Sequence, residues 1–288
     1  MKYDYEFNVK DLFQNANRMA DYVRTNPDGY RNFLAIAARC EHFTPSNQLL
    51  IHGFGEGKIP EYLDDYSNWI NKGFSINDNA TIIHVMENDN KSQTGYIDRM
   101  LVDVSDTNAV WHKNEYDKGI VLEALMTSSP CRIEFNPELT SKAVYIPNRQ
   151  VIEVSRGYKN IEQIFENLSR EMVHARLHLE MLSANKDTPD NIEVSYPRNR
   201  NNFKAYSVSY MLASKYNMAP EQIEMSSLPS EWSNLSDIHL SRNKSQDGVA
   251  AKIFRNDVIA DINKSFRTMD SVLNEKILSM YSQTGSEL

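Results

Sequence analysis

The sequence has few cysteines, no long apolar run and no repeated or low-complexity tract. Two cysteines in 288 residues, Cys40 and Cys131, are too few for a disulfide scaffold or a cysteine-based zinc knuckle. No apolar run approaches the roughly 18 residues that a membrane helix needs, which argues against a membrane partner. Residues 1–10 lack the basic-then-apolar pattern of a signal peptide. We therefore expect a cytoplasmic protein with reduced thiols.

The chain also lacks the basic excess that is typical of proteins binding nucleic acid through phosphate neutralisation. It carries 31 Lys and Arg against 39 Asp and Glu, a formal net charge of −8. Residues 1–130 hold 12 basic and 19 acidic residues, so nearly all of the acidic excess, a net charge of −7, lies there. Hydrophobic residues make up 41%, which argues for a folded core. The length favours two domains.

The spacing of apolar residues changes along the chain from a helical period to strands and back. It predicts helices over residues 8–26, 30–41, 66–71, 116–127, 160–183, 201–216 and 248–282, with a short helix through 49–51. It predicts strands over residues 81–85, 98–104, 132–135, 143–146 and 151–154, the last two joined as a hairpin. The pattern indicates an α+β fold, in which a helical N-terminal domain with a small strand pair precedes a small sheet packed on helices.

The helix predicted over 160–183 carries part of a metallopeptidase pattern. Such a helix places two His four residues apart on one zinc ion, with a Glu beside the first His as general base. Glu171 and the second His, His174, are present, whereas Arg170 stands at the position of the first His. Arginine stays protonated and has no lone pair to donate to a metal. Glu171 is therefore a residual catalytic residue, His174 a residual ligand, and we expect no metal.

A shifted zinc site is the alternative on the same helix. His174 and His178 are four residues apart, and Glu171 lies on the same helical face. A zinc ion held by His174 and His178 would sit one turn further along the helix. In the simpler interpretation, these side chains form pairs on a solvent-exposed face.

Several segments in one order resemble the ArdC-type antirestriction family of plasmids and conjugative elements. The resemblance covers nearly the whole chain. Its segments are 43–51 (aromatic–Ser–x–x–Asn–x–x–Leu–Ile in the family), 69–73 (Trp–x–x–x–Gly), 101–107, the 160–183 helix, 205–210, Trp232 and the final helix. The resemblance implies a single-stranded-DNA-binding domain, here residues 1–113, followed by a zincin-like metallopeptidase domain, here residues 114–288.

Departures from the family pattern fall on the zinc site. The family's later helix resembles Glu-x-Glu-Ala-Glu-Ser-Val-Ala-Tyr and supplies an acidic third ligand. In this chain Ala205, Ser207, Val208 and Tyr210 match, but the acidic positions hold Asn202, Lys204 and Tyr206. Two separate elements of the site are thus replaced, which the resemblance identifies as a degenerate metallopeptidase.

Candidate nucleic-acid-binding residues lie in the N-terminal domain. Arginines and aromatic side chains together can form a groove that stacks single-stranded bases. The candidates are Arg31, Arg39, Asn47, Trp69 and Lys72. Structural roles compete with this interpretation, because arginines on amphipathic helices are usually solvated and tryptophans are usually core. For Asn47 we favour the structural role.

The combined prediction is an ArdC-like accessory protein of antirestriction type from a mobile genetic element. It would bind single-stranded DNA or a host protein through a chain whose metallopeptidase domain is catalytically inactive. Two alternatives remain open. One is an active zinc metallopeptidase using Glu171, His174 and His178; the other is an acidic inhibitor that mimics DNA charge and binds a protein partner.

Overall fold

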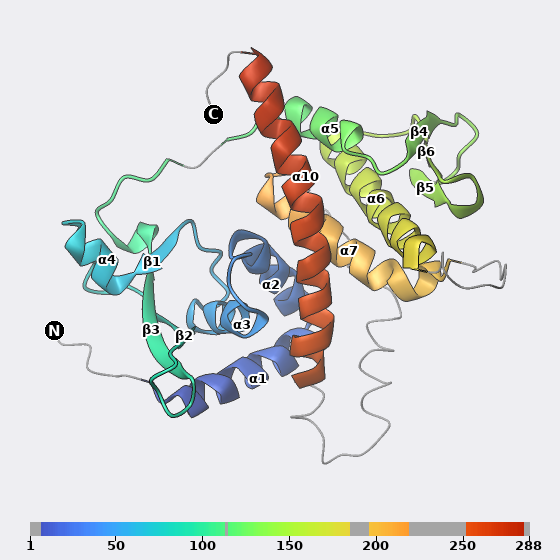
Figure 1. Ribbon diagram of the computed structural model, residues 1–288. Coiled ribbons are helices and arrows are strands. Elements are labelled where there is room, and N and C mark those ends of the chain that lie inside the picture. Colours follow the sequence, from blue (N-terminus) through green and yellow to red (C-terminus); the bar gives the residue numbers. More distant parts are fainter. Residues whose placement is uncertain (1–6, 113–114, 185–195, 219–251, 285–288) are drawn as a thin grey trace. The chain divides into compact units, whose positions relative to one another are not determined.

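The computed structural model describes residues 7–112, 115–184, 196–218 and 252–284 (Figure 1). The chain divides into two compact units, a first unit of residues 1–113 and 235–261 and a second unit of residues 114–234 and 262–288. The predicted domains, 1–113 and 114–288, stay a prediction. The two compact units divide the chain differently, because residues 235–261 group with the first unit. Trp232 lies outside the described residues.

The first unit combines helices with one antiparallel sheet. Its helices are α1 (Val9–Thr25), α2 (Pro27–Arg39), α3 (Pro45–Phe54), α4 (Tyr66–Asn71), the short 3-10 helix η1 (Val104–Asp106) and the π-helix η4 (Phe254–Ile259). Its strands are β1 (Leu63–Asp65), β2 (Ile83–Asn88) and β3 (Tyr96–Asp103), in the order β1-β3-β2. The predicted strand pair is present as β2 and β3. The three-residue strand β1 was not predicted, because so short a run carries no periodicity.

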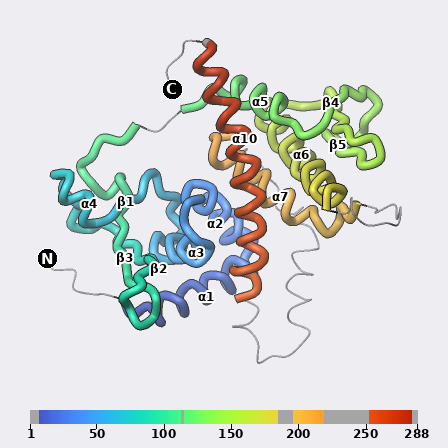
Figure 2. Tube along the Cα trace, in the orientation of Figure 1, coloured from blue at the N-terminus to red at the C-terminus, as the bar shows by residue number. Residues whose placement is uncertain are grey.

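Local sequence signals fix where the first three helices begin. Asn8, Asn26 and Thr44 each accept a hydrogen bond at a helix N-terminus, and a proline follows directly after Asn26 and after Thr44. The helices α1 and α3 contact the sheet, and α2 packs against α1 and α3; Figure 2 shows the path of the chain through these elements. The buried residues of this core are Leu12, Ala16, Ile36, Cys40, Leu50, Ile51, Ile83, Val85, Met86 and Leu101.

The second unit packs a three-stranded sheet against long helices. Its elements are α5 (Lys118–Thr127), β4 (Arg132–Phe135), β5 (Ala143–Ile146), the 3-10 turn η2 (Pro147–Arg149), β6 (Val151–Val154), α6 (Ile161–Ala184), α7 (Arg198–Lys215) and, from its third residue on, α10 (Ala260–Thr284). The order is β4-β6-β5, with β4 parallel to β6 and β5 antiparallel to it. The strands and the hairpin occupy the predicted residues, so the predicted α+β fold is confirmed.

The helix α6 is the centre of the second unit. It contacts β5 and β6 on one side and α7 on another (Figure 1). Phe165, Leu168 and Met172 are almost fully buried along it. The helix α7 begins at Arg198, three residues before the predicted start. Among the described residues, none of the helices has the length and apolar content needed to cross a bilayer.

Candidate functional site

The helix α6 carries the residual metallopeptidase pattern on its buried face. Glu171 and His174 have no solvent exposure, and His178 is 5% exposed. Their spacing of three and four residues places them on one side of the helix. The interpretation of these side chains as pairs on a solvent-exposed face is therefore wrong. Their burial means that each polar atom needs a partner within the protein.

The carboxylate of Glu171 is fully engaged by donors from β5 and α7. The backbone N–H of Tyr145 donates to Oε2 at 2.8 Å. Nη2 of Arg198 lies 2.7 Å from both carboxylate oxygens, and Nε of Arg170 lies 3.5 Å from Oε1. A general base needs a free lone pair directed at a water molecule. In this arrangement both oxygens of Glu171 accept hydrogen bonds from the protein instead.

The two histidines of α6 bind different tyrosines. Nδ1 of His174 lies 2.8 Å from the hydroxyl of Tyr196, and Nδ1 of His178 lies 2.8 Å from the hydroxyl of Tyr145. Nε2 of His174 is buried and has no hydrogen-bond partner among the described residues. The structure thus brings Glu171, His174 and His178 to one helical face and gives each a separate partner.

Electrostatics around His174 favour its neutral form. Burial is the largest effect, and the positive charges of Arg198 and Arg170 add to it, so that the pKa of His174 falls to about 3. The nearby Asn202 side chain opposes these effects. Burial likewise lowers the pKa of His178. Two guanidinium groups therefore supply the positive charge at this site.

The replaced zinc-site positions lie near one another. The guanidinium of Arg170 stacks over the ring of Tyr206 at 4.7 Å, and Asn202 lies near His174. Asn202 and Tyr206 are two of the positions where the family pattern has acidic residues. The described residues contain no group of three or more His, Cys, Asp or Glu side chains that could hold a metal ion. With Arg198 bound to Glu171 as well, these residues do not fit a zinc ion.

Two of the candidate nucleic-acid-binding residues are buried in the first unit. Asn47 is 6% exposed; its Nδ2 donates to the Met86 carbonyl at 2.8 Å, and its Oδ1 accepts the Met86 N–H at 2.9 Å. It thus joins α3 to β2. Trp69 is 3% exposed and donates through Nε1 to the Val102 carbonyl at 3.0 Å. Neither side chain presents an open face on which a base can stack.

The basic candidates lie at separate places. Arg31 pairs with Asp28 on α2, and Arg39 lies in the last turn of the same helix. Lys72 follows α4, where it pairs with Asp64 at 2.6 Å and lies over the Trp69 ring at 5.6 Å. Among the described residues, the structure shows a direct contact between two of the five candidates, Trp69 and Lys72. It shows none that links Arg31, Arg39 or Asn47 to another candidate.

Sequence reasoning missed two groups of residues. In the first unit, Tyr62 and Trp111 stack at 4.3 Å and are 36% and 44% exposed, and Tyr62 also contacts the edge of Trp69. In the second unit, Arg198 and Tyr196 complete the surroundings of Glu171 and His174. Tyr62 and Trp111 are isolated aromatics with no periodic neighbours, and Arg198 falls in a stretch without helical pattern. Only the fold brings them to these places.

Comparison with solved structures finds the same fold. No protein-family model and no curated protein matches the sequence. The Mn(II)-bound crystal structure of the antirestriction protein ArdC from plasmid R388 matches with a TM-score of 0.52 and 13% identity, over 94% of this chain and 98% of that chain. The metal-free structure of the same protein gives a TM-score of 0.46 and 14% identity, over 82% and 86%. At such identity the likeness concerns the fold.

Breaking the pair between Arg198 and Glu171 is expected to destabilise the protein. Arg198→Met leaves the Glu171 carboxylate buried without its cation, and we expect a loss of about 2 kcal/mol in the free energy of unfolding, below the range for fully buried pairs because Arg198 is partly exposed. Urea unfolding measures it. Adding Glu171→Gln should recover part of the loss. Arg176→Met is the control, since Arg176 pairs with the exposed Glu180 on the same helix. Equal losses from the two arginine variants would contradict this account.

The pKa of His174 predicts a pH dependence of stability. The folded protein takes up this proton only near pH 3, whereas the unfolded chain takes it up near pH 6.5. The unfolded state therefore binds more protons between these values, and stability falls as the pH falls through that range, by up to about 1.4 kcal/mol per pH unit from this group. Unfolding of His174→Gln at pH 4.5 and pH 7 should show a smaller change than wild type. His112→Gln, at an exposed position, should match wild type.

Proposed function

We propose that this chain is an ArdC-like accessory protein of antirestriction type from a mobile genetic element, which acts by binding rather than by hydrolysis. The observation that carries the second part is the contact of Arg198 with both oxygens of Glu171. Arg198 therefore holds a permanent positive charge against the Glu171 carboxylate, and its guanidinium group has no lone pair with which to bind a metal ion. The likeness in fold to ArdC of plasmid R388 supports the antirestriction role.

The shifted zinc site at Glu171, His174 and His178 is less well supported. Zinc takes an imidazole through a free lone pair. Nδ1 of His174 and Nδ1 of His178 are both engaged with tyrosine hydroxyls, which leaves only their Nε2 atoms to bind a metal. The remaining nitrogen of His174 lies in the field of Arg198 and Arg170, which repels a divalent cation as it repels a proton. We therefore propose a protein without a catalytic metal.

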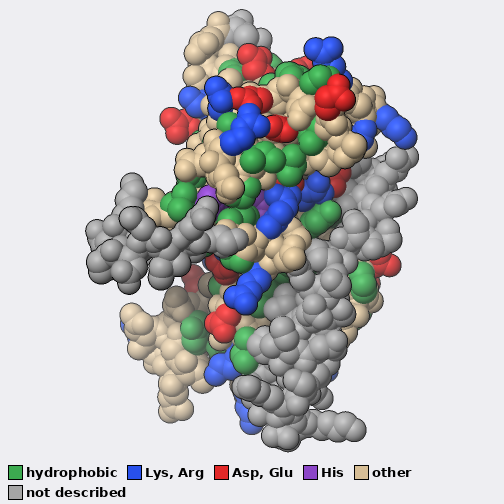
Figure 3. Space-filling model, turned by 90° about the vertical axis from the view of Figure 1, so that its right-hand side faces the viewer, with side chains coloured by type: hydrophobic (Ala, Val, Ile, Leu, Met, Phe, Trp, Pro, Cys, Tyr) green, Lys and Arg blue, Asp and Glu red, His purple; other side chains and the backbone are tan. Residues whose placement is uncertain are grey.

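Charge favours a protein as the partner. The acidic excess of residues 1–130 opposes binding to a phosphate backbone and attracts a basic protein surface. On the face drawn in Figure 3, the described Lys and Arg side chains lie beside Asp and Glu side chains instead of forming a field of one sign. A host protein partner is consistent with both observations, because the net charge opposes a phosphate backbone and the described side chains on that face form no continuous basic surface for one.

Single-stranded DNA is the second candidate partner, and one observation favours it. Trp111, Tyr62 and Trp69 form a continuous aromatic row, and Lys72 lies beside Trp69. Tyr62, the middle ring, and Trp111 at one end are partly exposed, whereas Trp69 at the other end is buried. Exposed aromatic rings are the elements that stack bases in single-strand binding sites, and Lys72, which pairs with Asp64, lies over the buried end of the row. We propose such binding at this row, which includes Trp69 and Lys72 of the five residues predicted from the sequence but not Arg31, Arg39 or Asn47.

The non-hydrolytic proposal predicts that one substitution cannot restore a zinc site. Arg170→His supplies the missing imidazole, but Arg198 still holds Glu171 and no acidic ligand is added. After dialysis against zinc and then buffer, wild type and Arg170→His should each retain well under one zinc per chain by elemental analysis. Neither should hydrolyse an unfolded protein substrate. One zinc per chain in either protein would overturn the proposal.

The single-strand candidate predicts binding that depends on Trp111. Fluorescence anisotropy with a labelled oligonucleotide at low and moderate salt should show affinity falling as salt rises. Trp111→Ala should weaken binding by roughly tenfold, since one base-stacking contact contributes about 1–3 kcal/mol. Phe135→Ala is the control, because Phe135 is exposed in the second unit. No binding at low salt would remove this candidate and leave the protein partner.

A further inference from the structure

A cavity of about 320 Å³ in the first unit is not used by the proposed function. It lies where α1, the start of α3, the ends of β2 and β3 at their hairpin, and η4 with the first residue of α10 come together. Its volume is near the lower end of the range of roughly 300–1,000 Å³ that is typical of small-molecule sites. The lining residues are Phe13, Thr44, Pro45, Ser46, Met86, Asn88, Tyr96, Asn256 and Ala260.

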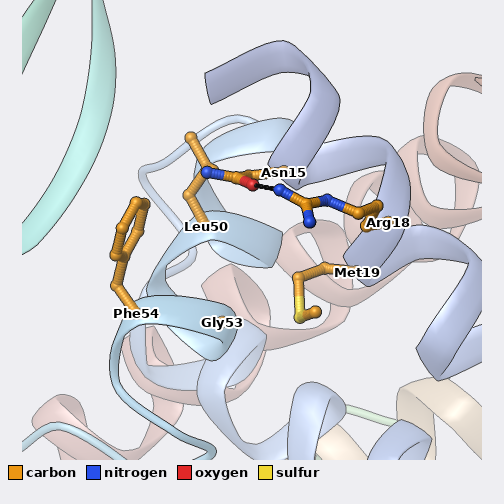
Figure 4. Close-up of a pocket in the computed structure, with 6 residues that line it drawn as sticks. All are labelled: Asn15, Arg18, Met19, Leu50, Gly53 and Phe54. Carbon is orange, nitrogen blue, oxygen red and sulfur yellow. Dashed lines mark hydrogen bonds between the residues drawn. The ribbon is translucent and has the colours of Figure 1, made fainter. Parts of the chain in front are cut away.

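None of the described residues that line this cavity is charged. Two other cavities of the same unit differ from it in this respect. One contains the carboxylates of Asp28 and Glu56. The other contains Arg18, which Figure 4 shows donating to Asn15. An uncharged lining offers no counter-charge to a phosphate, carboxylate or ammonium group, so the ligand that fits the 320 Å³ cavity is itself uncharged.

The hydrogen-bonding side chains of this cavity are accessible to a ligand. Asn88 and Asn256 are exposed, and Ser46 and Tyr96 are partly exposed. The hydroxyl groups of Ser46 and Tyr96 and the carboxamide of Asn88 make no hydrogen bond to another described residue. Hydroxyl groups can both donate and accept, and a carboxamide places a donor beside an acceptor. The lining therefore suits a ligand that carries both donors and acceptors.

The fold fixes where three of these groups lie. Asn88 and Tyr96 are directly opposite each other on β2 and β3, so their side chains share one face of the sheet. Ser46 precedes Asn47, whose carboxamide bonds the backbone of Met86 at 2.8 Å and 2.9 Å and thereby holds the start of α3 on β2. Because these groups are held in place before a ligand arrives, binding orders few side chains.

Asn256 reaches the cavity from the opposite element, η4. Arg255 is 6% exposed and donates through Nη1 to Oδ1 of Asn17 on α1 at 2.8 Å. It also donates through Nε to Oδ1 of Asn256 at 3.1 Å, which leaves the NH₂ group of Asn256 as a donor. η4 is a π-helix, and such segments are frequent at functional sites.

Two aromatic rings give the cavity a surface for a planar ligand. Phe13 and Tyr96 are half-buried, and their rings meet edge to face with the centroids 5.6 Å apart. In that arrangement one ring keeps both of its faces clear of the other. Aromatic side chains stack on nucleobases, and asparagine pairs through both ends of its carboxamide with the N6 and N7 edge of adenine. The carboxamide of Asn88 beside these rings therefore favours an adenine base over a saccharide, which has no planar face.

We propose that this cavity binds an uncharged nucleoside through its adenine base. The base stacks beside Tyr96 and pairs with the carboxamide of Asn88, while Ser46 and Asn256 bond its remaining polar atoms. The acidic excess of residues 1–130 opposes the phosphate groups of a nucleotide or a strand, which makes the free nucleoside the expected ligand. The site goes beyond the proposed function and does not depend on it, because neither the region around Glu171 nor the aromatic row includes these residues.

Two nucleosides of nearly the same shape test the proposal by calorimetric titration of the full chain. Adenosine carries the 6-amino group that pairs with Asn88, and purine riboside lacks it. We expect saturable binding of adenosine and about tenfold weaker binding of purine riboside, because one hydrogen bond is lost and an acceptor is left without its partner. Equal affinities for the two nucleosides, or no binding of adenosine, would overturn the proposal.

Variants assign the binding to this cavity. Asn88→Ala should weaken adenosine binding about tenfold, because it removes both a donor and an acceptor. Ser46→Leu places a larger apolar side chain in the cavity and should weaken it at least as much. Asn90→Ala is the matched control, since Asn90 is exposed in the same hairpin and does not line the cavity. Thermal unfolding establishes that each variant is folded. Equal affinities of Asn88→Ala and Asn90→Ala for adenosine would contradict the assignment.

Probes that carry phosphate distinguish a free nucleoside from a base of a nucleic-acid strand. Adenosine monophosphate and an adenine trinucleotide present the same base with added negative charge. Both should bind no more tightly than adenosine, because none of the described lining residues is cationic. Tighter binding of the trinucleotide that Asn88→Ala weakens would assign the cavity to single-stranded nucleic acid and overturn the free-nucleoside proposal. Tighter binding of the monophosphate would likewise overturn it, and so would glucose binding as tightly as adenosine.

Discussion

The arrangement of the second unit depends on how the negative charge of one buried carboxylate, that of Glu171, is compensated. The residue has no solvent exposure, so its charge must be compensated inside the protein. Arg198 meets this requirement from the first residue of α7, and the backbone of Tyr145 contributes from β5. One side chain of α6 thereby joins a strand and a helix that are distant in sequence. Burial keeps His174 neutral, and the positive charges of Arg198 and Arg170 add to that effect.

The elements with complete local signals could be predicted from the sequence. The strands β4, β5 and β6 and the helix α4 occupy the predicted residues, because apolar alternation and flanking turn residues mark them fully. The sequence predicts the start of α7 three residues too late, because Arg198 and its neighbours are polar and show no helical face. Within the described part of the final predicted helix, Phe254–Ile259 is π-helical, a change of hydrogen bonding that side-chain spacing does not reveal.

The loss of the zinc ligands at the candidate site could be predicted from the sequence, but the contact of Arg198 with Glu171 could not. Arg170 at the first histidine position and Asn202 on the later helix can be recognised from the sequence alone. The role of Arg198 depends on tertiary contact with α6, and no spacing rule links the two. In the first unit, Trp69 and Tyr62 differ in exposure because one contacts the sheet and the other a neighbouring ring. Aromatic residues in a sequence therefore identify candidates for stacking, and only packing decides which of them reach the surface.

The contact between Tyr145 and Glu171 has a further consequence for the sheet of the second unit. β5 is the last strand in the order β4-β6-β5, so it is an edge that another extended chain could join. The N–H of Tyr145 is already bound to the Glu171 carboxylate. A peptide that added to β5 as a fourth strand and paired at Tyr145 would have to displace that carboxylate and leave Arg198 without its partner. The ion pair of Glu171 and Arg198 thus also opposes strand addition at β5, one of the two edge strands of this sheet among the described residues.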